Sequence, residues 1–332
     1  MTAAEAGAAS VPVSGVPASG VPASLVPASG VQYEVSGGGY EAVLGSVGAT
    51  LRSVSFHGRP LLASFEADEV RPGMRGALLA PWPNRLADGR YEFDGVEHQL
   101  ALSDPVTATA LHGLAAWTDF SCVRWGSGGV ALCGRIEPQT GYPWRLRLDV
   151  EVSVSAGGMR QRITATNEST RRAPIGLGVH PYLVVGAEAG PGAPEPAEGD
   201  VDGWRLSMPA TDVMLVSEDR MLPLGVVDLA ERPDLDFTAE REIGDAALNH
   251  AYAGATGARL TDARGRGVEM GWDEGCAWVQ LYSDDLDGPG RRRSALAVEP
   301  MTCPPDAFSS GTDLRVLAPG EATSLEWWLR AV

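Results

Sequence analysis

Two ionisable residues of this chain occupy the same kind of setting, each between a valine and a proline. His180 lies in the apolar run GLGVHPYL, and Glu299 lies in AVEPMTCPP. A residue before proline is restricted to extended conformations, so the local backbone fixes the direction of each side chain. An imidazole and a carboxylate held in this way suit proton transfer onto and off a bound polar molecule. Taken singly, each also fits a structural role, as a hydrogen-bonded core histidine or a strand-end carboxylate.

Two further residues stand where a ligand could be recognised. His112 is followed by a glycine in LHG, and that glycine permits close approach of the backbone to a ligand. Arg85 lies in the proline-rich loop APWPNRLADG, and its planar fork suits recognition of hydroxyl or carboxylate groups, although such arginines are more often solvated charges. His57 and His98 carry no such signal, and we assign them no function.

Motifs of several other enzyme classes are absent from the sequence. It contains no GxSxG elbow, no Walker A loop, no HExxH, and no GxGxxG placed between a strand and a helix. All 26 basic residues are arginine, which removes Schiff-base and P-loop chemistry that depends on lysine. The cysteines show no CxxC spacing, so we expect no metal site and reduced, packed thiols, with Cys122 and Cys133 facing each other across a hairpin.

The charge of the chain excludes one class of partner. The net charge is −17 over 332 residues, so a cationic surface for nucleic acid or anionic lipid is not expected. The local cluster Arg291-Arg292-Arg293 is interpreted as part of a solvated loop. No apolar run is long enough to span a membrane, and the first basic residue is Arg52, so a signal peptide is not predicted. We therefore expect a cytoplasmic location.

The N-terminus differs in composition from the rest of the chain. Residues 11–30 repeat a pentad, VPVSG VPASG VPASL VPASG, that cannot bury enough apolar surface to offset its ordering entropy. We predict a disordered repeat tail over residues 1–32 and one folded domain over residues 33–332. Within that domain, the glycine-, proline- and acid-rich stretch 186–203 is predicted to be a weakly ordered insertion.

The elements that must position these residues are predicted to be strands. Residues 145–155, RLRLDVEVSVS, alternate apolar and polar side chains, and residues 159–169 are their expected hairpin partner. Asp94-Gly95 is a type I′ turn signal between two further strands. Residues 322–332 form a final strand with Trp327 or Trp328 facing inward. Helical periodicity is scarce, so the pattern favours a large, all-β antiparallel sandwich.

Six segments in order along this pattern resemble the motif series of the aldose 1-epimerase (galactose mutarotase) family. They are APWPNRLADGRYEFDGVEHQL, ALHGL, GLGVHPYL, LNHAY, WVQLYSD and AVEPMTCPPDAF. The resemblance covers residues 33–332. It implies the galactose-mutarotase-like β-supersandwich, with few short helices, and interconversion of the α and β anomers of an aldohexose such as galactose or glucose.

The family pattern also implies roles for individual residues. Glu299 would be the base at the anomeric hydroxyl, and His180 would be the acid at the ring oxygen. Because the acid must start protonated, we expect a neighbouring acid or hydrogen bond to keep part of His180 charged near neutral pH. The remaining positions carried over from the family would bind the sugar; they are Asn84, Arg85, His112, Tyr182, Asn249 and Gln280. The mechanism needs no cofactor, and none is expected.

One departure from the family leaves alternatives open. Asn249 in LNHAY stands where the family usually has aspartate, so sugar preference does not follow from the resemblance. A hexose-6-phosphate epimerase would need a phosphate cradle, which residues 291–293 would supply if their loop reached the pocket. A non-catalytic sugar-binding or sensing module would keep the sugar-binding pocket but would have lost catalysis. The expected partner is a small aldose; the oligomeric state is open, with a monomer the default.

Overall fold

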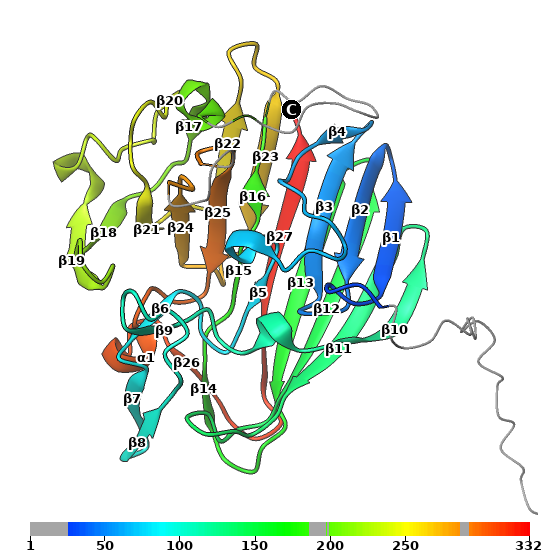
Figure 1. Cartoon of the computed structure of the whole chain (residues 1–332). Coiled ribbons are helices and arrows are strands. Elements are labelled where there is room, and N and C mark those ends of the chain that lie inside the picture. Colours follow the sequence, from blue (N-terminus) through cyan, green and yellow to red (C-terminus); the bar gives the residue numbers. More distant parts are fainter. Residues whose placement is uncertain (1–25, 186–196, 198, 286–291) are drawn as a thin grey trace, which may run out of the picture.

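The computed structural model describes residues 26–185, 197, 199–285 and 292–332 (Figure 1). Nearly all of its regular structure is antiparallel β-strand, with one short helix, α1 (Ala307–Ser310), and single 3-10 turns at 72–74, 115–117, 200–203 and 229–231. No helix among the described residues is long and apolar enough to cross a membrane. The predicted all-β antiparallel architecture is confirmed.

A sandwich of two sheets forms the N-terminal and central part of the fold. A four-stranded sheet packs on the β11 to β13 side of a nine-stranded sheet (Figure 1). The four-stranded sheet has the order β1 (Gln32–Gly37), β2 (Tyr40–Gly45), β3 (Thr50–Phe56), β4 (Arg59–Pro60). The nine-stranded sheet has the order β10 (Ser121–Gly126), β11 (Gly129–Ile136), β12 (Leu146–Ser155), β13 (Gly158–Asn167), β27 (Ala322–Ala331), β23 (Gly267–Trp272), β22 (Gly257–Thr261), β17 (Arg205–Ser207), β20 (Arg241–Glu242).

A third sheet, of eight strands, carries the residues singled out for chemistry. Its order is β19 (Pro223–Asp228), β18 (Asp212–Val216), β21 (Asn249–Ala253), β24 (Trp278–Tyr282), β25 (Leu296–Met301), β15 (Gly178–Val179), β5 (Leu78–Leu79), with β16 (Tyr182–Leu183) also paired to β25. Three short pairs complete the fold: β6 (Arg85–Ala87) with β9 (Thr109–Leu111), β7 (Arg90–Phe93) with β8 (Val96–Gln99), and β14 (Ala173–Ile175) with β26 (Arg315–Leu317). One large apolar cluster joins all three large sheets into a continuous core.

The strand predictions made from alternation agree with the structure. β12 and β13 pair over their whole length, and every second residue of β12 from Leu146 is buried. Asp94 and Gly95 both have positive φ in the turn between β7 and β8, as a type I′ turn requires. In β27 it is Trp327 that faces inward, where its indole N–H donates to Gln161 Oε1 at 2.7 Å.

Two expectations about individual side chains are wrong. Cys122 pairs with Leu132 and Cys133 with Ser121, because a bulge between Cys122 and Arg124 shifts the register and keeps the two cysteines from lying opposite each other. All the cysteines are free, but Cys122 is exposed rather than packed. Arg293 was expected in a solvated loop, yet it is buried.

The surroundings of Arg293 explain its burial. Its guanidinium donates to Asp202 Oδ1 and Asp285 Oδ1, both at 2.6 Å, and to the carbonyl oxygens of Gly244 and Ala246. Four acceptors therefore replace the water that the charge gives up. A tract of three arginines in the sequence could not reveal that the last of them would meet these acceptors from distant segments.

The predicted boundary between tail and domain, at Tyr33, falls within the described part of the chain. Residues 1–25 of the predicted tail, and residues 186–196 and 198 of the predicted insertion, lie outside the described part of the chain. Ser29, within the range assigned to the tail, donates to the carbonyl of Ala67 through both its backbone N–H and its hydroxyl. Contacts with the domain thus begin a few residues before Tyr33, and the division into tail and domain stays a prediction.

Replacing Arg293 by alanine is predicted to destabilise the fold by about 2 kcal/mol, because it leaves Asp202 and Asp285 without their cation. This is less than the roughly 3–5 kcal/mol for breaking a fully buried pair, because Asp202 is half-exposed. Urea unfolding measures the change. Arg264→Ala, at an exposed position, is the control; equal effects of the two substitutions would contradict the prediction.

Candidate active site

Three neighbouring strands present polar side chains on one face of the eight-stranded sheet. Gln280 of β24 is directly opposite Glu299 of β25 and, on its other side, Ala251 of β21. Opposite residues of antiparallel strands share a face, and Asn249 lies two residues before Ala251, so it shares that face too. Gln280 Nε2 donates to Asn249 Oδ1 at 2.8 Å, which ties the two amides together.

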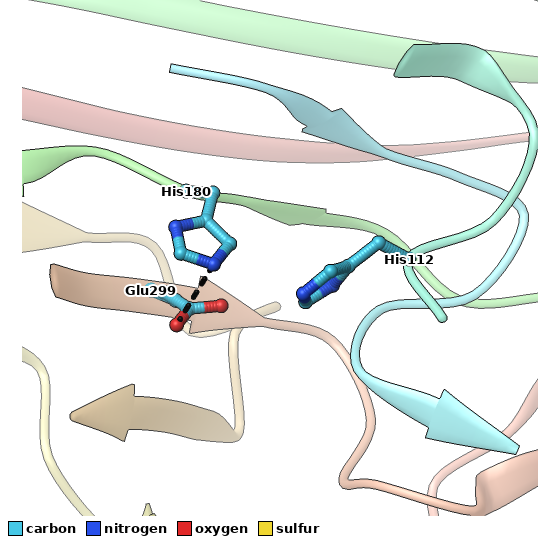
Figure 2. A group of neighbouring side chains, drawn as sticks. All are labelled: His112, His180 and Glu299. Carbon is cyan, nitrogen blue, oxygen red and sulfur yellow. Dashed lines mark ion pairs between the residues drawn. The ribbon is translucent and has the colours of Figure 1, made fainter. Parts of the chain in front are cut away.

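His180 is fixed by its backbone in the link between β15 and β16. Its N–H donates to Ala77 O at 3.1 Å, and its carbonyl accepts from Gly76 N at 2.9 Å. The ring stacks on Tyr182 at a centroid distance of 5.1 Å. Its Nε2 lies 3.3 Å from Glu299 Oε1, with only 5% and 2% of the two side chains exposed (Figure 2). The two proline-constrained residues thus meet in a buried contact.

The third residue drawn in Figure 2, His112, is held by Asn84. Asn84 N–H donates to His112 Nδ1 at 3.2 Å, and His112 N–H donates to Asn84 O at 2.9 Å. Because Nδ1 accepts a hydrogen bond, the proton of the neutral imidazole lies on Nε2, which becomes a donor. Both residues have positive φ, so this paired turn is a strained local arrangement. The imidazole ring lies 5.0 Å from that of His180.

One cationic side chain stands beside this group. Arg85, the first residue of β6, is partly buried and lies 3.6 Å from Asp104, measured from Nη2 to Oδ2. Its charge also acts on Glu299 and lowers the pKa of that carboxyl, although less than burial raises it. Arg85 is therefore the nearby charge that favours the carboxylate form of Glu299.

All eight site residues expected from the sequence line one cavity of about 180 Å³. Their roles remain predictions, but the structure brings them together from segments far apart in the chain. Sequence reasoning missed four further residues of the wall, namely Gly73, Met74, Leu111 and Tyr282. Tyr282 could have been found, because it lies two residues after Gln280 on the same strand. Gly73 and Met74 belong to a 3-10 turn that no motif marks, where Tyr182 donates its hydroxyl to Gly73 O at 2.8 Å.

Burial controls the charges in this cavity. It raises the pKa of Glu299 well above its ordinary value, and it lowers the pKa of His180 to about 3, with the charges of Arg71 and Arg85 acting in the same direction. The expectation that His180 is partly charged near neutral pH is therefore wrong. Burial therefore favours the neutral form of both groups, the protonated carboxyl of Glu299 and the uncharged imidazole of His180.

Two buried oxygen atoms of the site have no hydrogen-bond partner among the described residues. They are Gln280 Oε1 and Glu299 Oε2. A buried acceptor without a partner costs free energy, on the order of 1–3 kcal/mol, and a ligand hydroxyl would remove that cost. His112, His180 and Glu299 also present ligand atoms within 4.8 Å of one another, so they form a group that could hold a metal ion.

Comparisons with known proteins agree on a family. The aldose 1-epimerase family profile matches residues 32–330. The chain is 33% identical over 298 residues to the uncharacterized protein YihR of Escherichia coli K12, covering 88% of this chain and 91% of that protein. It is 28% identical over 176 residues to galactose mutarotase of Rattus norvegicus, a match that covers 51% of this chain and 46% of the rat protein.

Solved structures show the same fold. A GalM/aldose epimerase homologue from C. elegans matches with a TM-score of 0.77 at 18% identity, covering 91% of this chain and 98% of the other. Galactose 1-epimerase from Lactobacillus acidophilus NCFM matches with a TM-score of 0.69 at 18% identity, covering 89% and 92%. The chain belongs to the aldose 1-epimerase family, and the predicted galactose-mutarotase-like fold is confirmed.

The lowered pKa of His180 predicts a pH dependence of stability. Above pH 6.5 the imidazole is neutral in both folded and unfolded chains. As the pH falls from 6.5 toward about 3, the unfolded chain binds a proton at His180 that the folded chain does not, so stability is lost. At pH 5 this amounts to about 2 kcal/mol, at roughly 1.4 kcal/mol per pKa unit.

Urea unfolding at pH 7.5 and pH 5 measures this loss. His180→Gln is expected to reduce the loss by about 2 kcal/mol, whereas His57→Gln, at an exposed histidine, should leave it as in the wild type. The raised pKa of Glu299 makes the stability fall as the pH rises above about 4.5, which is the opposite trend. Glu299 is present in the wild type and in both variants, so the comparison isolates His180. An unchanged pH dependence in His180→Gln would show that the imidazole is protonated in the folded protein.

Proposed function

We propose that this protein is an aldose 1-epimerase that interconverts the α and β anomers of aldohexoses such as galactose or glucose without a cofactor. The observation that carries the proposal is the buried contact of His180 with Glu299, 3.3 Å long, inside a cavity lined largely by polar side chains. Its volume, about 180 Å³, is of the order of a single sugar ring. Family membership supports the same reaction class.

Mutarotation requires two proton transfers at opposite ends of one bond. A carboxylate at Glu299 removes the proton from the anomeric O1 hydroxyl, and an imidazolium at His180 gives a proton to the ring oxygen O5. The C1–O5 bond breaks as the C1=O1 double bond forms, and the open-chain aldehyde results. Rotation about C1–C2 presents the other face of the carbonyl. Ring closure then reverses both transfers and returns each group to its starting state.

The resting charges require one step before this sequence. Because burial favours the neutral forms of Glu299 and His180, we place a proton transfer from the carboxyl to the imidazole, across the Oε1 to Nε2 contact, at the binding of the sugar. The charge of Arg85 disfavours the imidazolium form of His180 but favours the carboxylate form of Glu299. Hydrogen bonds from sugar hydroxyls to the unpartnered Oε2 of Glu299 act in the same direction. The short contact gives the proton a direct path between the two groups.

The remaining residues orient the sugar. His112 carries its proton on Nε2, and we propose that this N–H donates a hydrogen bond to the ring oxygen or to a neighbouring hydroxyl of the sugar. Gln280 Oε1 accepts from a hydroxyl, because its amide nitrogen is already bonded to Asn249. Asn249 keeps its own amide N–H groups for the ligand. Arg85 and Asn84 complete the polar wall, and the Tyr182 ring forms the apolar one.

The phosphosugar alternative finds little support in the described part of the chain. Arg293, which was to supply part of a phosphate cradle, is occupied by Asp202 and Asp285. Arg85 is paired with Asp104. A dianionic phosphate would have to displace these carboxylates.

Polarimetry of freshly dissolved α-D-galactose and α-D-glucose tests the proposal. The wild type should accelerate the change in rotation, and Glu299→Gln and His180→Asn should each lower kcat by roughly 10²–10⁴, the usual contribution of a general acid or base. His57→Gln is the matched control and should retain full activity.

Other results of the same assays would identify a phosphosugar epimerase or a sugar-binding module instead. A wild type that matches buffer on both sugars but accelerates anomer exchange of glucose 6-phosphate would establish a phosphosugar epimerase. Sugar binding in calorimetry without acceleration of any sugar would establish a binding module. Either result would overturn the proposed reaction on neutral hexoses.

The group of His112, His180 and Glu299 predicts how metals affect the rate. A zinc ion there would occupy the carboxylate and imidazole lone pairs that proton transfer uses. We therefore expect EDTA to leave the polarimetric rate unchanged and Zn²⁺ to inhibit. His112→Asn should weaken the inhibition, because it removes one ligand. Loss of activity in EDTA that Zn²⁺ restores would contradict this expectation and point to metal catalysis.

A further inference from the structure

A second cavity adjoins the first. It has a volume of about 700 Å³, within the range of ligand sites, and it shares Arg85, Asn249 and Tyr282 with the catalytic cavity. We call the space around His180 and Glu299 the inner chamber and this larger space the outer chamber. Because three residues line both, the outer chamber begins at side chains that border the catalytic pair.

The outer chamber has walls that are tied to each other. One wall is the loop 104–109, and another is the turn between β18 and β19. Arg220 of that turn donates to Thr107 O and Ala108 O, both at 2.9 Å, and to Asp88 Oδ1 at 2.7 Å. The loop itself is closed by the Thr107 hydroxyl, which donates to Asp104 Oδ2 at 2.7 Å. The chamber is therefore a formed site and not a gap between independent loops.

Asp104 connects this wall to the inner chamber. It accepts from Thr107 on one side and pairs with Arg85 on the other. Arg85 in turn stands beside Glu299. A ligand group in the outer chamber thus lies next to a side chain that also acts on the catalytic carboxyl.

The lining of the outer chamber indicates what fits it. Apolar side chains of Val106, Val216, Met221 and Leu248 contribute much of the surface, and Val106 is 88% exposed. Carboxylates lie among them, at positions 104, 218, 219 and 285, whereas Arg85 and a neutral His250 are the basic groups. Acceptors beside apolar surface match the hydroxyl edge and the C–H face of a sugar ring. An anionic group would meet several like charges.

Resting on the proposed epimerase function, we propose that the preferred substrate is a reducing oligosaccharide. Its reducing-end aldose occupies the inner chamber, where the anomeric bond opens, and the next neutral sugar occupies the outer chamber. Binding energy from the second ring then holds the first ring against His180 and Glu299. Interactions remote from the reacting bond raise kcat/KM in this way.

Anomer exchange followed by NMR of the reducing-end proton tests the proposal. Glucose is compared with maltose, cellobiose and isomaltose, which place the second ring at different positions. At least one disaccharide should show a kcat/KM at least tenfold above that of glucose. Ala247→Trp fills the outer chamber and should bring that ratio to about one. Ala239→Trp, at an exposed alanine outside the chamber, is the matched control and should keep the wild-type ratio.

The experiment distinguishes failure of the oligosaccharide proposal from failure of the proposed epimerase function. If glucose or galactose is accelerated while every disaccharide falls at or below glucose, the oligosaccharide proposal is overturned and the epimerase function stands. A disaccharide preference that survives Ala247→Trp places the second ring elsewhere and also overturns it. If no sugar is accelerated, both proposals fall.

Discussion

The site depends on one buried contact, in which His180 Nε2 lies 3.3 Å from Glu299 Oε1. Burial alone would make the carboxyl a poor acid and the imidazole a poor base, and their pKa values move in those directions. A proton shared across 3.3 Å avoids an isolated buried charge, because the pair is neutral whichever group holds it. In the proposed reaction, the rest of the site supplies the electrostatic bias that moves that proton when a sugar binds.

The sheet and the loops position different groups of the site. The register of β21, β24 and β25 sets Asn249, Gln280 and Glu299 on one face, and regular strands hold such positions more accurately than loops do. Loops supply the groups whose hydrogen-bonding direction matters. Asn84 fixes the tautomer of His112 through backbone contacts in both directions, so the ring faces the cavity as a donor.

Local patterns predicted the strands well, because alternation and turn chemistry act over a few residues, as in β12 and at Asp94-Gly95. Local settings singled out His180, Glu299, His112 and Arg85, the family resemblance added the other four site residues, and all eight line one cavity. What escaped prediction depended on three-dimensional surroundings. Burial decided the charge of His180, a bulge displaced Cys122 from Cys133, and acceptors from distant segments buried Arg293.

Asn249 shows how a departure from the family pattern fits this balance. An aspartate there would place a second negative charge on the face that carries Glu299, and a like charge raises the pKa of a carboxyl further. Burial already raises that pKa, so a neutral amide keeps the carboxylate form of Glu299 within reach of the bias from Arg85. The amide still accepts from Gln280, and Asn249 lines both chambers. Asparagine thus exchanges one charge for a donor at a position that lines both chambers.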